Sequence, residues 1–425
     1  MVHGPCCGDS IRRRACRLRD LPRVTGSDVV FDPFSDEYFD DPYEIYKRLR
    51  DEAPVYFNER YGFYALSRYA DVAAAHLDWE TFSSSHGTDL ATMSGDPQMV
   101  AEMASIIMLD PPAHDRLRVL VSRVFTPRAT AGVEPMVRRV IGEHLDAIGD
   151  RREFDAVAEL SALFPVEIIS EMLGVAPSDR QQIRQWLDAA LHREHGEMLP
   201  NAAGEQAYVA MGTYFYELAV AKRADPGDDL LSRLTTVSVD RGDGATTRLS
   251  DIEIAGFAAL LGGAGAETVT KLVGNAFVLF HRHPDQWQTI VADPSQAAGA
   301  VEEILRLLPP SQYQGRFSVR DSSSYGETIP AGFPVLLLTG AANRDERQYL
   351  EPDRFDIERQ VGHALGFGFG IHSCLGAALA RLESRVIIEE MARRWPCYEV
   401  DEAGLKRVHM ANVAGYANVP VTVLP

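Results

Sequence analysis

The chain has little cysteine, and it has no long apolar segment that is free of glycine and charge. Only 5 of its 425 residues are Cys, and three of these lie within residues 1–27. The other two, Cys374 and Cys397, are too few for a disulfide framework, which indicates a reducing, cytoplasmic setting. Because no apolar run of transmembrane length lacks glycine and charge, the sequence predicts a soluble body without a membrane span.

Positive charge is also scarce. The chain has 42 Lys and Arg against 61 Asp and Glu, a net charge of −19. Residues 1–27 carry six Arg and two Asp, and subtracting their net charge of +4 leaves −23 on the rest. Nucleic acid is therefore excluded as a partner, because phosphate binding needs clustered cations. An export signal would place an apolar stretch after the arginines, and none follows, so residues 1–27 are expected to be a disordered extension.

The rest of the chain reads as one unit. No linker rich in Pro, Ser or Gly divides it and no internal repeat appears, so we expect a single domain over residues 28–425. Helical periodicity dominates residues 112–308. Short alternating strands are predicted at four places: 54–66, 314–319, 334–338 and 413–424. The predicted fold class is mainly α with small β-sheets (α+β).

One glycine-rich, aromatic segment near the C-terminus holds a single cysteine, in the sequence FGFGIHSCLG over residues 367–376. Glycine lets the backbone approach a flat cofactor closely. We expect a helix to begin at Leu375, so that its N–H groups and dipole stabilise an anionic sulfur. A lone cysteine is usually structural, but this combination has roughly a few chance matches per million chains of this composition. The candidate residues are Phe367, Gly368, His372, Cys374 and Gly376.

This segment resembles the haem-binding loop of the cytochrome P450 family, and four further segments match in the family's order from about residue 31 onward. The resemblance implies the P450 fold, with a long central helix over haem b, and Cys374 as the iron ligand. A thiolate ligand favours O–O cleavage over O2 storage. The implied activity is that of a monooxygenase that inserts one atom of O2 into a C–H bond. Electrons would come from a ferredoxin and its reductase, since the chain has no flavin or iron–sulfur motif.

A second matching segment lies inside the apolar run 250–281 and reads LGGAGAET from Leu261 to Thr268. Each mid-helix Gly costs about 1 kcal/mol relative to Ala, which suggests that something large and flat lies against this helix. The resemblance implies that Ala264 and Gly265 contact the haem. It also implies that Glu267 and Thr268, beside a helix widened at Gly265, hold water and relay protons. The plainer alternative is a core helix with a polar edge.

Haem carries two propionate carboxylates, and burying them without cationic partners would cost several kcal/mol. His114 and Arg118 are four residues apart on one predicted helical face. Arg316 lies in the predicted strand 314–319, and His372 precedes the cysteine by two residues. Each would be an ordinary polar residue without the resemblance, which implies that the four bind the propionates.

Glu303 and Arg306 are three residues apart on one helical face. They resemble the family's buried pair that braces the haem pocket against a later meander, here residues 342–345 and 352–355. We interpret the pair as structural rather than catalytic.

Electron delivery requires positive surface near the cysteine. Arg116, Arg123, Arg128 and Arg381 flank the helices expected on the thiolate side, where a small acidic ferredoxin would dock. The alternative is that these are scattered, solvated arginines.

The substrate pocket is expected to be walled by residues 83–108, 260–264, 308–313 and 413–416. The first wall holds Met93, Met99, Met103 and Met108, which are adaptable apolar side chains, although such methionines are more often plain core. We expect a largely apolar substrate such as a terpenoid, a steroid, a fatty acyl group or another natural-product intermediate. One polar anchor is expected among Ser311, Gln312 and Tyr313.

Two alternative functions share these motifs. Oxidative coupling or peroxide-driven oxidation would keep the haem, but peroxide-driven relatives tend to lack the acid–alcohol pair, so Glu267 and Thr268 favour O2. A haem sensor or binding module without turnover would have no need for a proton relay.

Overall fold

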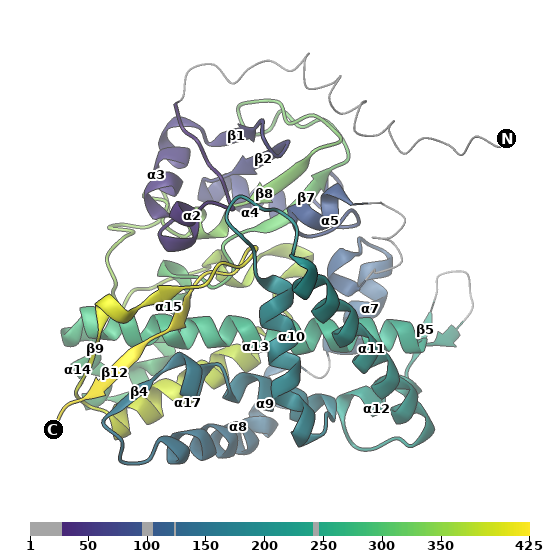
Figure 1. Ribbon diagram of the computed structural model, residues 1–425. Helices are drawn as coiled ribbons and strands as arrows, with labels where there is room; N and C mark the ends of the chain where they lie inside the picture. The colour runs from purple at the N-terminus through teal and green to yellow at the C-terminus, as the bar shows by residue number, and fades with distance from the viewer. Residues whose placement is uncertain (1–27, 96–104, 123–124, 241–245) are drawn as a thin grey trace.

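The computed structural model describes residues 28–425 except 96–104, 123–124 and 241–245 (Figure 1). The predicted extension 1–27 therefore lies outside the described residues, as do Met99, Met103 and Arg123. Helices dominate the described chain, and the strands form small sheets. This confirms the predicted class, mainly α with small β-sheets.

The central element is α13 (Asp251–Arg282), which crosses the middle of the molecule in Figure 1. Ser250 begins it with a capping box: its Oγ accepts the Glu253 N–H, and the Glu253 carboxylate accepts the Ser250 N–H. Within the described residues, α13 alone is long and apolar enough to cross a membrane. Most of it is buried against other helices, so it is the core helix predicted over 250–281.

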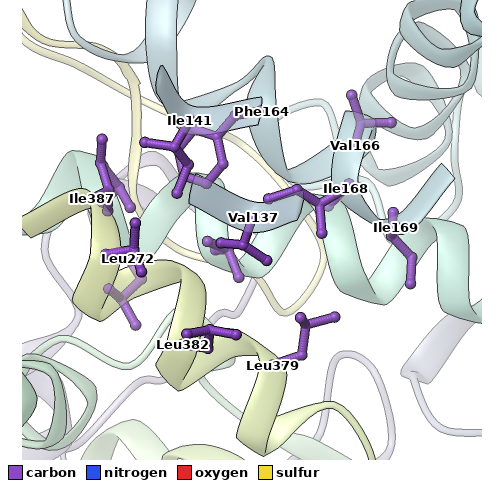
Figure 2. Close-up of a cluster of buried hydrophobic side chains, with 14 of the residues drawn as sticks. Val137, Ile141, Phe164, Val166, Ile168, Ile169, Leu272, Leu379, Leu382 and Ile387 are labelled. Carbon is purple, nitrogen blue, oxygen red and sulfur yellow. The ribbon is translucent and has the colours of Figure 1, made fainter. Parts of the chain in front are cut away.

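Two helices pack against α13, α9 (Phe164–Leu173) and α17 (Ala377–Arg394), and α8 (Pro127–Ile148) packs against both of them. Figure 2 shows their apolar side chains meeting around Leu272. Burying each such side chain contributes roughly 1.5–3 kcal/mol. The labelled contributors are Val137 and Ile141 of α8, Phe164, Val166, Ile168 and Ile169 of α9, and Leu379, Leu382 and Ile387 of α17.

Two further helices, α10 (Arg180–Leu191) and α11 (Ala202–Ala224), pack against α13, and α10 crosses it in Figure 1. The remaining helices are α2 (Asp36–Asp40), α3 (Tyr43–Glu52), α4 (Tyr69–Leu77), α5 (Leu90–Ser94), α7 (Ala113–Ser122), α12 (Leu230–Thr236), α14 (Pro284–Ala292), α15 (Ala297–Leu307) and α16 (Thr339–Ala342).

The largest sheet has the strand order β1-β2-β8-β7-β3. Only β2 and β8 pair in parallel, and the other neighbours are antiparallel. The strands are β1 (Val55–Asn58), β2 (Phe63–Leu66), β3 (Phe82–Ser83), β7 (Gln314–Ser318) and β8 (Pro334–Leu337). The strands predicted over 54–66, 314–319 and 334–338 are thereby confirmed.

The predicted strand 413–424 is split in two. One part, β12 (Pro420–Val423), lies between β4 (Glu153–Asp155) and β9 (Tyr398–Val400), and the other, β11 (Tyr416–Asn418), pairs with β10 (Lys406–Arg407). A hairpin of β5 (Ser238–Asp240) and β6 (Thr246–Arg248) and the strand β4 interrupt the region predicted as helical.

A fully buried ion pair braces α15 against the chain that precedes the cysteine segment. Arg306 Nε and Nη2 donate to the two Glu303 carboxylate oxygens at 2.7 and 2.8 Å, and both side chains are 0% exposed. Arg306 Nη1 also donates to the Asn343 and Pro352 carbonyls. The Asn343 side chain in turn accepts the Leu365 N–H at 2.7 Å. The structural interpretation of this pair, with its link to the meander, is confirmed.

Candidate active site

The cysteine lies in a tightly turned segment, residues 365–376, here called the cysteine loop. Gly368 and Gly370 have φ angles of +68° and +72°, a region that side chains other than glycine disfavour. A Cβ on Gly370 would also lie 2.6 Å from the His76 carbonyl oxygen. The Cys374 N–H donates to the Phe367 carbonyl at 2.8 Å and closes the loop. Glycine is therefore needed for the backbone path and for the close approach of α4.

The surroundings of Cys374 differ from the prediction. Helix α17 begins at Ala377 with Gly376 as its N-cap, so the predicted start at Leu375 is wrong by two residues. The cysteine side chain is exposed, yet it lies among enough protein atoms that burial raises the pKa of its thiol. A hydrogen bond from the Gly376 N–H and the charges of Arg118 and Arg381 act in the opposite direction.

Burial therefore outweighs the helix terminus, and the sequence overestimated the stabilisation of a free thiolate. Coordination to a metal removes the proton from such a thiol. A thiol that stays protonated until metal binds is still a suitable ligand for haem iron.

The four predicted cationic donors gather beside the cysteine loop. The rings of His114 and His372 lie with centroids 4.5 Å apart, and Arg118 Nη2 donates to the Ser373 carbonyl at 2.6 Å. Burial, and then the charges of Arg316, His114 and Arg118, lower the pKa of His372 to about 2. We call His114, Arg118, Arg316 and His372 the cationic cluster.

This cluster holds buried donors that the described protein atoms leave unmatched. Arg316 is 5% exposed and its Nη1 donates to the neighbouring Gly315 carbonyl. Burial lowers the Arg316 pKa to about 10, although the charge of Asp110 opposes this. Within the described chain, Nε2 of His114 and Nε2 of His372 have no hydrogen-bond partner. An unpaired buried charge costs several kcal/mol, so the arrangement fits the two propionate carboxylates of a haem.

Sequence reasoning missed His76 on α4. It is 3% exposed, and neither ring nitrogen has a hydrogen bond of acceptable geometry with a described residue. Burial, and then the Arg316 charge, lower its pKa to about 3, while the nearby Gln314 amide opposes the shift. Its Cε1 lies 4.0 Å from the position a Cβ would take on Gly368. No motif marks this histidine, because its place beside the loop is set by tertiary packing.

On α13, Ala264 and Thr268 share one face. Ala264 is exposed and Thr268 is half-buried, and Thr268 Oγ1 donates to the Ala264 carbonyl at 2.9 Å. The helix is α-helical throughout residues 264–268, so the local widening expected at Gly265 is wrong.

The glycines of α13 serve helix packing. A Cβ at three of them would lie 3.1–3.2 Å from a side chain of another helix: Gly262 from Phe215 on α11, Gly263 from Leu187 on α10, and Gly265 from Ile169 on α9. Helix packing thus accounts for these three glycines, and the contact of Gly265 with a flat cofactor stays a prediction. Of the small residues in this segment, Ala264 is the exposed one.

Glu267 points to a different side of α13 from Thr268. Its carboxylate lies 2.6 Å from Lys271 Nζ, and the two side chains are 4% and 5% exposed. On α10, burial and then the charge of Glu267 raise the pKa of Asp188 to about 6. Sequence reasoning overlooked both partners. The i,i+4 spacing could have indicated Lys271, whereas no sequence signal indicated Asp188.

The predicted pocket walls are brought together in part. Ser311 forms a β-bridge with Val413, which places the segments 308–313 and 413–416 side by side. Gln312 and Tyr313 are buried, and their donor groups bind the Pro309 and Ala411 carbonyls at 2.6 and 3.0 Å. Neither donor group is free to bind a substrate, so of the three candidates for one polar anchor only Ser311 is left. Ser311 remains partly exposed.

Two other side chains from the sequence analysis have different roles from those expected. Met93 is buried in an aromatic cluster beneath the large sheet, as plain core. Arg381 makes a two-point ion pair with Glu302 at 2.5 and 3.1 Å and lies over the Phe367 ring, so its charge is partly neutralised. Arg128 is exposed.

Comparisons with known proteins agree with this geometry. Residues 216–403 match the family model described as Cytochrome P450. Putative cytochrome P450 123 of Mycobacterium tuberculosis is 41% identical over 402 residues, covering 94% of this chain and 98% of that protein. Erythromycin C-12 hydroxylase of Saccharopolyspora erythraea is 36% identical over 379 residues, covering 88% and 92%.

Among solved structures, CYP109E1 from Bacillus megaterium in complex with testosterone matches with a TM-score of 0.82 and 28% identity, covering 92% of this chain and 99% of that one. These relatives share more than one third of their residues with this chain over nearly their full length. The cysteine loop and the central helix also lie in the expected places, so the family is established. The chain belongs to the cytochrome P450 family of haem-thiolate monooxygenases.

Proposed function

We propose that this monooxygenase hydroxylates a largely apolar small molecule of steroid, terpenoid, fatty acyl or macrolide type. The observation that carries the proposal is the Ala264–Thr268 face of α13, on which Ala264 is exposed and the apolar Leu260 and the Thr268 side chain are half-buried. The relatives named for erythromycin hydroxylation and crystallised with testosterone support the same range of substrates. Ser311 is the one member of the predicted polar anchor whose side chain stays partly exposed.

In this proposal Cys374 binds the haem iron, and the cationic cluster binds the propionates. Phe367, Gly368 and Gly376 would shape the backbone beside the macrocycle, and Ala264 would contact it from α13. When bound, the haem supplies the O2 activation that C–H hydroxylation requires. Gly265 contributes indirectly, by letting α9 approach α13.

Proton delivery is assigned to Thr268 and Glu267. The Thr268 hydroxyl proton is used in its bond to the Ala264 carbonyl, so its oxygen lone pairs are left to accept a hydrogen bond from a water. That water would be held on the exposed face of α13, next to the bound substrate. Glu267 supplies the proton from the adjacent face of the helix.

Electrons are proposed to come from a separate ferredoxin and ferredoxin reductase in the cytoplasm. The exposed Arg128 is one cation suited to a small acidic partner, and electrostatic steering of this kind raises association rates. Residues 28–425 are proposed to act as one catalytic domain.

The test has two parts. A panel of steroids, terpenes, fatty acids and macrolides is titrated while the Soret band is followed, to find a substrate. Product formed per reduced nicotinamide is then measured for wild type and Thr268→Ala with a surrogate ferredoxin and reductase. We expect product formation to fall about 100-fold, equivalent to about 2.7 kcal/mol, while substrate binding and reduction persist.

Thr270→Ala is the matched control, because the Thr270 hydroxyl lies two residues away on α13 and donates to the Ser161 carbonyl at 2.7 Å. Unchanged coupling in Thr268→Ala would contradict the proposed proton path. Full turnover with peroxide and none with O2 would favour the peroxide-driven alternative.

A further inference from the structure

Among the described residues, four arginine side chains are buried, and two of these have no carboxylate partner. Arg50 and Arg306 pair with glutamates at 3.5 and 2.7 Å. Arg193 and Arg316 are 6% and 5% exposed, and neither has an ion-pair partner in the described part of the chain. Arg316 belongs to the cationic cluster, which fits the haem propionates. Arg193 is therefore a buried cation whose anion is not yet identified.

The protein uses only part of the Arg193 guanidinium. Its Nε donates to the Met198 carbonyl at 3.1 Å, and its Nη1 donates to the Ala190 and His192 carbonyls at 2.9 and 2.8 Å. An arginine side chain has five N–H donors. These bonds leave the two N–H groups of Nη2 without a partner among the residues that the structure describes. Unused donors on a buried cation are suited to a bound anion.

Arg193 lies beside segments that the sequence analysis assigned to the substrate pocket. Its backbone N–H donates to the His409 carbonyl at 2.9 Å, which ties the end of α10 to residues 408–414. Further along the same segment, the Ala414 N–H donates to the Pro310 carbonyl at 2.8 Å. The residue after Pro310 is Ser311, the remaining candidate for a polar anchor. Residues 408–414 therefore connect Arg193 with Ser311.

An apolar cluster lies along this connection. It consists of Val408, Met410 and Val413, which are buried, and of Leu191 at the end of α10, which packs against them. We call these four residues the C-terminal cluster. Ligand sites are typically apolar surfaces on which a few placed polar groups fix the orientation. A buried cation beside the C-terminal cluster fits a molecule with an anionic end and a hydrocarbon body.

We propose that Arg193 binds the carboxylate of an apolar acid, such as a long-chain fatty acid, and so orients the substrate of this monooxygenase. The hydrocarbon part would pack on the C-terminal cluster. This inference rests on the proposed function and narrows its substrate from four chemical types to the fatty acyl type with a free carboxylate. Arg193 makes and breaks no covalent bond in this role.

The charges around Arg193 are consistent with a missing anion. Burial lowers the pKa of Arg193, although the charge of Asp89 opposes this. Asp89 is the N-cap of α5, and its carboxylate accepts the Thr92 N–H at 3.0 Å. It thus acts on Arg193 through space and not in an ion pair. Because a buried charge without a close partner costs several kcal/mol, a substrate carboxylate in contact with Nη2 would be favourable.

The competing explanation is that Arg193 only holds the end of α10. The Ala190 and His192 carbonyls lie at the C-terminus of this helix, where cationic side chains are favourable partners. A fatty acid and its methyl ester separate the two explanations, because they share one hydrocarbon chain and differ in charge. A structural role would make Arg193 substitutions weaken both ligands equally.

The experiment titrates the haem-loaded enzyme with hexadecanoic acid and with its methyl ester near neutral pH, where the acid is ionised. Binding is followed by the Soret band and by calorimetry. In wild type we expect the acid to bind about tenfold more tightly than the ester, as for a hydrogen bond to a charged group. In Arg193→Gln the dissociation constant of the acid should rise by about tenfold, while that of the ester stays within about twofold.

Two further variants test the charge and the location. Arg193→Lys keeps the charge and should retain part of the preference for the acid. Arg60→Gln is the matched control, because Arg60 also reaches the loop after α10, at the Gly196 carbonyl, but its side chain is 62% exposed and pairs with Asp32. We expect Arg60→Gln to bind both ligands as wild type does.

The wild-type comparison needs no folded variant. Equal affinity for the acid and the ester in wild type would overturn the inference, and so would equal weakening of both ligands in Arg193→Gln. If a steroid or a macrolide is hydroxylated while fatty acids do not bind, the proposed function stands and this inference fails. Binding of the acid that depends on Arg193, without hydroxylation of any ligand, would support this site and contradict the proposed function.

Discussion

The rings of His114 of α7 and His372 of the cysteine loop meet edge to face with centroids 4.5 Å apart, and Nε2 of each ring has no hydrogen-bond partner among the described residues. Arg118 and Arg316 lie close enough that their charges lower the pKa of His372. Four buried or half-buried donors in one place repel a further proton and attract anions. The geometry therefore makes haem retention depend on each of them.

Arg316→Ala should weaken haem retention, because it leaves a propionate without its buried partner, a loss of about 3–5 kcal/mol. The measurement is the ratio of Soret to protein absorbance after gel filtration in mild denaturant. Arg320→Ala is the control, since Arg320 is 59% exposed in its pair with Glu80. Equal retention in Arg316→Ala and wild type would remove Arg316 from the site.

Burial of His76 should make the free energy of unfolding fall as the pH drops into the mildly acidic range. Its pKa is lowered to about 3 in the fold, whereas an unfolded histidine titrates near 6.5. The unfolded state therefore binds a proton between these values, and stability falls as the pH drops below about 6.5. Between pH 7.5 and 5.5 the loss is about 1.4 kcal/mol. Urea unfolding at both pH values should show a smaller loss in His76→Gln, and an unchanged loss would contradict the assignment.

Cys374→Ser should abolish the carbon-monoxide difference band that is diagnostic of thiolate ligation in the reduced protein. Cys397→Ser is the matched control, because Cys397 is the other described cysteine and is also unpaired. The spectra of the two variants are compared at equal haem content. Survival of the band in Cys374→Ser would refute Cys374 as the ligand.

Glu303→Gln should destabilise the fold by about 3–5 kcal/mol, because it leaves the Arg306 guanidinium buried without its counter-charge. The adjacent Glu302 offers a control, since its pair with Arg381 is partly exposed and such pairs contribute about 0–1 kcal/mol. Urea unfolding of Glu303→Gln and Glu302→Gln gives both values. Similar losses of unfolding free energy in the two variants would mean that burial does not make the Glu303–Arg306 pair more stabilising than an exposed pair.

Gly370→Ala should lower both stability and haem retention. Its φ of +72° costs a side chain about 1–3 kcal/mol, and the added Cβ would collide with the His76 carbonyl at 2.6 Å. Gly362→Ala is the control, because Gly362 has a φ of +65° but nothing within 4 Å of its Cβ position. The loss of Tm in Gly362→Ala measures backbone strain alone, and the extra loss in Gly370→Ala measures the collision. Equal losses of Tm in the two variants would show that the collision contributes nothing.

Local patterns determined much of what the sequence predicted correctly. The apolar run 250–281 is a short-range feature, so α13 could be placed to within a residue. The cysteine loop is a contiguous motif, and its glycines are needed for positive φ angles within it. The i,i+3 spacing of Glu303 and Arg306 places both on one face of a helix. The family resemblance was carried by the same contiguous segments.

The tertiary structure decided everything that depends on two segments meeting. Gly262, Gly263 and Gly265 of α13 face Phe215, Leu187 and Ile169 on three other helices, and no pattern within α13 could indicate those contacts. The donor groups of Gln312 and Tyr313 bind backbone carbonyls. These two candidates for the predicted polar anchor are therefore buried structural residues.

Asp188 and His76 gained their environments in the same way. The chain determines that each can carry a proton, but the pKa of a side chain follows from its burial and from the charges that folding brings near it. Asp188 lies near Glu267 because α10 crosses α13 at a glycine, and His76 lies near Arg316 because α4 packs beside the cysteine loop. The sequence by itself determined the candidate iron ligand, the central helix and the family, and only the packing of distant segments decided the burial and charge around each titratable side chain.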